Sequence, residues 1–150
     1  MNSNPQKFTP QELKDLYEKC ILLWENGNLM NEKFDVRSGK NYRRIKSKFG
    51  LTLKSMTTER DVQTEFQLLK SNTLINENLF CFHNSKKNLL KSYFYYLRNI
   101  AAHADIVKKR ISGVNWYFIE HKSRNKIKFF GQIKSSNYWS VRNEFLKLKR

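Results

Sequence analysis

The longest regular pattern of apolar residues in the chain lies between Ser85 and Lys109. Apolar side chains recur there at steps of three and four residues, namely Leu89, Leu90, Tyr93, Phe94, Leu97, Ile100, Ala101 and Ala104. This spacing places them on one face of a helix, and so wide an apolar face has to be covered by other parts of the chain. We therefore predict a long core-facing helix over residues 85–109, around which the other elements pack.

Weaker patterns predict four more helices and one β-hairpin. Thr9-Pro10-Gln11-Glu12 has the form of a capping box with proline at the first helical position, and predicts a helix that ends near Asn26-Gly27. A narrow apolar stripe predicts a short helix near 42–49, and residues 57–59 open another. After Gly113 the apolar period changes to two, which predicts a hairpin over 114–133 with its turn at 122–125. Ser136 caps a final helix.

These elements predict a single domain, residues 1–150, of the mainly α class with a β-hairpin and a C-terminal helix. A chain of 150 residues with 39% hydrophobic residues is long enough to bury a core. Cys20 and Cys81 are too few for a disulfide framework and lack metal-ligand spacing. No stretch approaches the ~20 apolar residues of a membrane span, and the first ten residues lack an apolar signal region. We expect a cytoplasmic protein that does not contact a membrane.

Positive charge is concentrated in two parts of the chain. The sequence has 29 Lys and Arg against 13 Asp and Glu, a net charge of +16, and residues 78–150 carry 16 of these bases but only 3 of the acids. Such a surface attracts polyanions, with nucleic acid as the first candidate and an anionic membrane surface as the second. The alternative is a solvated, lysine-rich surface without a partner. The candidate RNA-binding residues in and around 37–54 and 108–110 are Arg43, Arg44, Lys46, Lys48, Lys108, Lys109 and Arg110, with Tyr95 as a stacking residue.

The predicted long helix contains the segment Tyr-Leu-Arg-Asn-Ile-Ala-Ala-His, residues 96–103. Asn99 and His103 are four residues apart and share a helix face. Arg98 and His103 are five residues apart, which separates them by roughly 140° around the axis. One helix does not aim both groups squarely at a small target, and two helices that meet around a symmetry axis would do so better.

This segment resembles the motif of the HEPN superfamily: Arg, a polar residue that is often Asn, a few small or apolar residues, then His. Arg98, Asn99 and His103 match these positions. The resemblance implies a HEPN-like antiparallel helical bundle, a homodimer in which two motifs face each other, and RNA cleavage without a metal or cofactor. It also implies a prokaryotic or phage setting as a toxin or abortive-infection effector, with a possible antitoxin or regulatory protein. Members paired with a nucleotidyltransferase antitoxin commonly carry Tyr where this chain has Asp105, so we do not expect that form of control.

The residue types suit RNA cleavage, because RNA carries its own nucleophile in the 2′-hydroxyl group. Histidine can take up and release protons near neutral pH, and the planar guanidinium group can bind two phosphate oxygens. We therefore predict a metal-independent endoribonuclease with Arg98, Asn99 and His103 as catalytic residues, leaving a 2′,3′-cyclic phosphate and a 5′-hydroxyl group. The alternative is a module that binds RNA or a nucleotide without cleaving it. A more distant alternative is an accessory protein that binds DNA.

Overall fold

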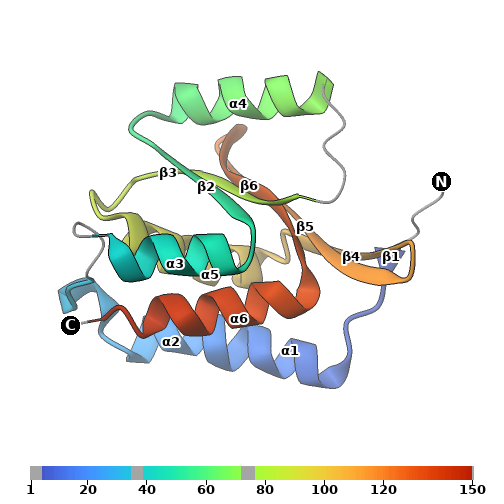
Figure 1. Ribbon diagram of the computed structural model, residues 1–150, viewed down its shortest axis with the longest axis horizontal. Helices are drawn as coiled ribbons and strands as arrows, with labels where there is room; N and C mark the ends of the chain where they lie inside the picture. Colours follow the sequence, from blue (N-terminus) through green and yellow to red (C-terminus); the bar gives the residue numbers. More distant parts are fainter. Residues whose placement is uncertain (1–4, 35–38, 72–76, 150) are drawn as a thin grey trace.

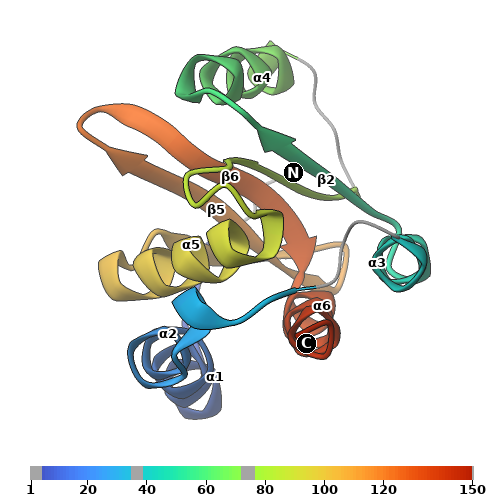
Figure 2. The ribbon, with the colours of Figure 1, turned by 90° about the vertical axis from the view of Figure 1, so that its left-hand side faces the viewer.

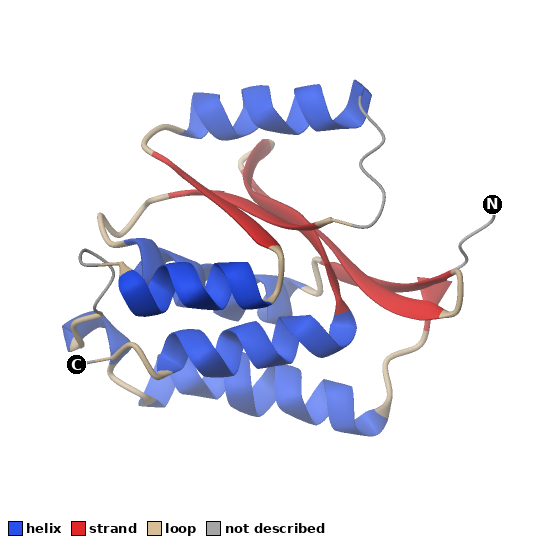
Figure 3. Cartoon of the chain, in the orientation of Figure 1, coloured by secondary structure: helices blue, strands red, loops and turns tan. Residues whose placement is uncertain are grey.

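The computed structural model describes residues 5–34, 39–71 and 77–149, with Met30, Lys70 and Ser71 described by their backbone alone. In this part of the chain, six strands form one mixed sheet in the order β1-β4-β5-β6-β3-β2 (Figures 1 and 3). The strands are β1 (Pro5–Gln6), β2 (Leu51–Met56), β3 (Asn78–His83), β4 (Ile106–Ile111), β5 (Val114–Ser123) and β6 (Lys126–Lys134). Strands β2 and β3 are parallel, and the other neighbouring pairs are antiparallel.

Helices cover both faces of the sheet (Figure 2). Helix α4 (Glu59–Ser71) lies on one face, where it packs mainly against β6 and β3. The helical segments gathered on the other face are α1 (Pro10–Leu16), the π-helical η1 (Tyr17–Leu22), α2 (Leu23–Asn26), the short η2 (Leu29–Asn31), α3 (Lys40–Lys48), α5 (Leu89–His103) and α6 (Ser135–Leu146). The molecule thus has three layers, with the sheet in the middle.

Two hydrophobic cores lie on opposite faces of the sheet. In the larger core, Phe80 and Phe82 of β3 pack against Tyr93 of α5, with ring centroids 5.7 and 6.4 Å apart. In the smaller core, Phe66 of α4 packs edge-on against Phe130 of β6 at 5.2 Å. Full burial of one such side chain contributes roughly 1.5–3 kcal/mol. Because the larger core contains most of the buried apolar side chains, it contributes most of the hydrophobic stabilisation.

The long core-facing helix, α5, spans Leu89–His103 and is shorter than the predicted range of 85–109. Asn88 caps α5 by accepting a hydrogen bond from the N–H of Lys91 at 3.0 Å. Ala104 adopts a left-handed conformation with φ 56°, and the N–H of Asp105 donates to the carbonyl of Ile100 at 3.0 Å, which closes the helix end. The chain then leaves as strand β4, so the helical prediction for residues 106–109 is wrong.

The prediction of a mainly α, HEPN-like antiparallel bundle is also wrong, because a six-stranded sheet forms the centre of the described structure. Four of its strands, β1, β2, β3 and β4, were not predicted. Strand β3 is buried on both faces, so its apolar run Leu79–Phe82 has no period of two. Strand β4 contains the basic run 108–110 and is held by pairing with β5.

Several local predictions are confirmed. The capping box between Thr9 and Glu12 is present at the start of α1, and the helical path continues through η1 and α2 to Asn26. The hairpin forms as β5 and β6, with Arg124 and Asn125 at positive φ in the turn. Helices α3, α4 and α6 also form where the sequence indicated them. The predicted cap of the last helix is wrong, because α6 begins at Ser135 with Lys134 at its N-cap, and Ser136 lies inside the helix. Within the described residues, no helix combines the length and the apolar character needed to cross a membrane.

Candidate active site

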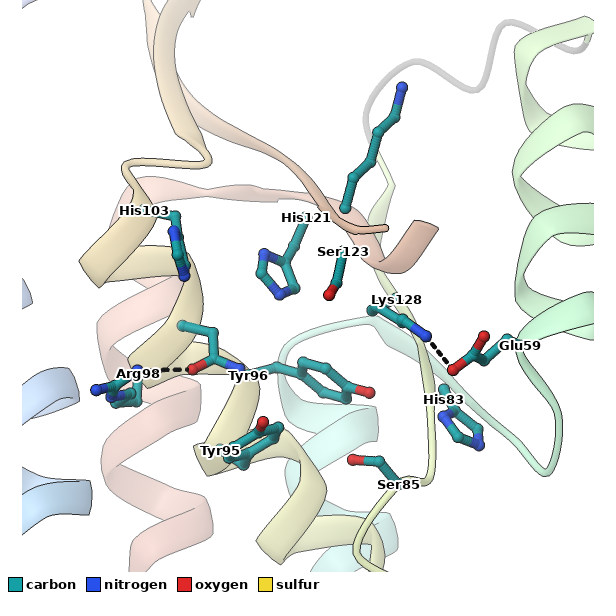
Figure 4. Close-up of a pocket in the computed structure, with 12 residues that line it drawn as sticks. Glu59, His83, Ser85, Tyr95, Tyr96, Arg98, His103, His121, Ser123 and Lys128 are labelled. Carbon is teal, nitrogen blue, oxygen red and sulfur yellow. Dashed lines mark hydrogen bonds and ion pairs between the residues drawn. The ribbon is translucent and has the colours of Figure 1, made fainter. Parts of the chain in front are cut away.

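A cavity of about 460 Å³ lies between α5, the C-terminal half of β5 and the ends of β3, β6 and α4 (Figure 4). The chain contains three histidines, and all of them line this cavity: His83, His103 and His121. The motif residues Arg98 and Asn99 line it as well. The remaining lining residues are Glu59, Ser85, Tyr95, Tyr96, Lys122, Ser123 and Lys128.

The three motif residues meet at this cavity within a single chain. Asn99 is buried on α5, and its Oδ1 accepts a hydrogen bond from Nη1 of Arg98 at 3.1 Å. His103 is exposed at the last residue of the helix. The angular separation that we predicted between Arg98 and His103 therefore does not prevent both residues from lining one site.

The Arg98 guanidinium group is engaged by a carboxylate from α2. Its Nε and Nη2 donate to Oε1 of Glu25 at 3.0 and 2.7 Å. Glu25 does not line the cavity, so this contact draws the guanidinium toward its edge. An anion in the cavity would compete with Glu25 for the same donors.

His121 and Asp105 form an imidazole–carboxylate pair that sequence reasoning missed. His121 is only 4% exposed, and its Nδ1 lies 2.8 Å from Oδ2 of Asp105. The ring centroids of His121 and His103 are 5.9 Å apart. The predicted turn at 122–125 placed His121 at the end of a strand. Its alternation with Tyr117 and Ile119 along β5, all on the buried face, is the signal that would have placed it inward.

The local backbone explains how Asp105 and His121 meet. The left-handed Ala104 reverses the chain after α5, and the N–H of Glu120 then donates to the Asp105 carbonyl at 3.3 Å. In β5, the pairing with β6 shifts register between His121 and Lys122. Such irregularities re-aim side chains next to functional sites.

The far side of the cavity holds a carboxylate between basic groups. Glu59 begins α4 and accepts a hydrogen bond from Lys128 of β6, and Lys126 lies 3.9 Å from its other oxygen. The Lys128 hydrogen bond and the charges of Lys128, Lys126 and His83 lower the pKa of Glu59 below its ordinary value. Burial raises the pKa of Tyr96, so its hydroxyl group stays protonated.

Positive charge exceeds negative charge in the lining. Glu59 is the one carboxylate among the lining residues, against Arg98, Lys122 and Lys128. A site with this balance, closed on one side by the sheet, raises the local concentration of anions. The described residues contain no group of three or more His, Cys, Asp or Glu side chains placed to hold a metal ion.

The predicted RNA-binding residues occupy different places. Tyr95 lines the cavity, with Nζ of Lys86 4.0 Å from its ring centroid. On α3, Arg43, Arg44 and Lys48 are exposed, whereas Lys46 is half-buried against the ring of Tyr42. Arg37, in the same basic stretch, lies outside the described residues.

The three residues of the other basic stretch, 108–110, lie on β4 in different environments. Lys108 is buried and bonded to Glu12 at 2.6 Å, so it does not present its charge to a ligand. Lys109 is half-buried beside Phe118, and Arg110 is exposed.

Comparison of the chain with models of protein families, with curated proteins and with solved structures finds no match.

Proposed function

We propose that this protein is an endoribonuclease that cleaves RNA at the cavity beside α5, using side chains for proton transfer and charge stabilisation. The observation that carries this proposal is that Arg98, Asn99 and His103 line one cavity together with the other two histidines of the chain. The excess of basic groups in the lining favours a phosphate as the bound group. The exposure of His103 gives a long polymer access to its imidazole.

In the proposed reaction, the RNA 2′-oxygen attacks the adjacent phosphorus atom and loses its proton to an imidazole. The bond from phosphorus to the 5′-oxygen breaks, and that oxygen gains a proton. The products are a 2′,3′-cyclic phosphate and a 5′-hydroxyl group. His103 is the candidate base, Arg98 stabilises the charge on the non-bridging oxygens, and Asn99 orients Arg98 through its hydrogen bond.

The Arg98–Glu25 contact favours a second candidate function. Because Glu25 already occupies two donors of the guanidinium group, the site as it stands is suited to reversible binding of RNA or a nucleotide. In that case Arg98 would exchange Glu25 for a phosphate, and no bond would be cleaved. The proposed setting as a toxin or abortive-infection effector, with a possible antitoxin, rests on the motif alone.

To distinguish the two functions, purified wild-type protein and an Arg98→Ala/His103→Ala variant would each be incubated with mixed RNAs in EDTA. We expect the wild type to leave cyclic phosphate ends, and loss of the His103 imidazole to slow cleavage by about 10²-fold or more. Equal cleavage by the double variant would assign the activity to another site or protein. Binding of RNA by the wild type without any cleavage would favour the binding module.

A further inference from the structure

The HEPN-like motif supplies one imidazole, but the proposed reaction moves two protons. One proton leaves the 2′-hydroxyl group, and another joins the departing 5′-oxygen. A second acid–base group within reach of the same phosphate would allow both transfers without relying on water. His121 meets this requirement, because it lines the same cavity and its ring centroid lies 5.9 Å from that of His103.

We propose that His121 is the general acid of this site, that His103 is the base, and that Asp105 is a positioning residue for His121. This inference rests on the proposed ribonuclease function and adds a residue that the motif does not contain.

The hydrogen bond to Asp105 defines how the His121 ring presents its nitrogens. Nδ1 lies 2.8 Å from the carboxylate oxygen, which accepts only, so Nδ1 is the donor. Nε2, on the opposite side of the ring, is then the nitrogen that can exchange a proton with a ligand. Figure 4 shows the ring inside the cavity, between His103 and the Ser123 side chain.

The same pair fits the role of proton donor. A protonated imidazole donates from both nitrogens, and a carboxylate at Nδ1 stabilises the positive charge that the ring carries before transfer. Asp105 is itself held at both backbone groups, by Ile100 at the end of α5 and by Glu120 of β5. Packing against Tyr96, with ring centroids 5.9 Å apart, restricts the His121 ring further.

His103 differs from His121 in its exposure to solvent. It is exposed at the end of α5, where a polynucleotide can bring a 2′-hydroxyl group to it. With His103 neutral and His121 protonated, the 2′-proton passes to His103 and the His121 proton passes to the 5′-oxygen. Exchange with water then returns both imidazoles to their starting states.

A chemically modified substrate tests this assignment. If sulfur replaces the scissile 5′-oxygen, the leaving group departs as a thiolate and needs no proton. We expect His121→Gln to cleave ordinary RNA about 10²- to 10⁴-fold more slowly than wild type. The same variant should cleave the sulfur-substituted RNA at a rate within about tenfold of wild type, whereas His103→Ala should remain slow on both substrates.

Asp105→Asn tests the positioning role by a readout other than rate. Nitrogen NMR of the imidazoles should place the proton of the neutral His121 ring on Nδ1 in wild type, and a smaller share of it there in Asp105→Asn. The matched control is Glu120→Gln, an exposed neighbour in the same strand whose side chain points to the other face of the sheet. We expect this control to cleave both RNAs at wild-type rates.

The outcomes separate this inference from the proposed function. Failure of wild type to cleave any RNA would overturn both. Loss of cleavage in His103→Ala alone, with His121→Gln as fast as wild type, would overturn the role of His121 and leave the ribonuclease proposal standing. A His121→Gln variant that is slow on the sulfur-substituted RNA as well would also exclude the general-acid role, because the substrate then needs no acid.

Discussion

Glu25 holds the Arg98 guanidinium group through two hydrogen bonds to one carboxylate oxygen, and so competes with any phosphate in the cavity. The Glu25 side chain is 45% exposed, and pairs this exposed contribute roughly 0.2–1 kcal/mol. A competitor of this strength does not block the site, but it lowers the apparent affinity for an anion. The contact thus sets how readily Arg98 becomes available to a ligand.

We expect Glu25→Gln to tighten binding of a non-cleavable 2′-deoxy oligonucleotide by about 1.5- to 5-fold, because the amide competes less well for the guanidinium. Fluorescence anisotropy at fixed salt would measure this change. Glu18→Gln, which removes an exposed acid from η1, controls for the general loss of negative charge. An equal gain in both variants would mean that Glu25 acts through net charge and not through Arg98.

The motif residues could be selected as candidates because they are neighbours in sequence, but that one helix would bring Arg98, Asn99 and His103 to a single cavity was not expected. Their partners could not be predicted in the same way. Glu25 lies 73 positions from Arg98, and Asp105 lies 16 from His121, so each contact depends on how the elements pack. Lys108 was misleading for a similar reason, because its sequence neighbours are bases but its partner is Glu12.

Glu12 joins the start of α1 to the sheet. Its carboxylate accepts hydrogen bonds from the backbone of Thr9, from Lys108 of β4 and from Tyr117 of β5. Burial disfavours the charged carboxylate, but these hydrogen bonds outweigh it, so the pKa of Glu12 lies below its ordinary value of 4.5. This part of the stability is complete above pH 4.5 and is lost as the pH falls through the folded-state value.

We expect Glu12→Gln to lower the free energy of unfolding by about 2 kcal/mol at neutral pH, less than the ~3–5 kcal/mol of a fully buried pair, because water still reaches this one. Urea unfolding from about pH 7 to about pH 3 would test this value, and the difference from wild type should shrink toward the acid end. Glu18→Gln, in the neighbouring segment η1, serves again as the exposed control. A pH-independent difference would mean that the ionised form of Glu12 is not what stabilises the junction.

Elements with local signals were predicted, and elements defined by their neighbours were not. The capping box, the hairpin and the amphipathic helices each show a cap, a turn or a period in the sequence. Strand β3 has only a short apolar run, because both of its faces are covered. Strand β4 follows the core-facing helix without a Gly or Pro, and the left-handed Ala104 that separates them is not a residue that favours this conformation.

For the whole molecule, the packing around α5 limits where two copies could meet. Segments η1 and α2 contact this helix on one side, and the sheet lies on the other. The last turn of the helix and the residue after it remain open, since Ala102, His103 and Ala104 are exposed. A two-fold dimer that brings the motif helices together would therefore meet at this end, next to the candidate base.

We expect the protein to form such a dimer, and a cysteine at Ala102 would detect it. Both native cysteines, Cys20 and Cys81, are buried, so they contribute little background. Because a disulfide requires Cα atoms within about 7 Å, Ala102→Cys should cross-link under oxidation, whereas Lys14→Cys on the exposed face of α1 should not. Light scattering of the reduced wild type at tens of micromolar should give twice the chain mass of 18.1 kDa. A monomer would contradict the dimer, and a dimer that cross-links only through Lys14→Cys would place the interface away from His103, leaving each cavity to work alone.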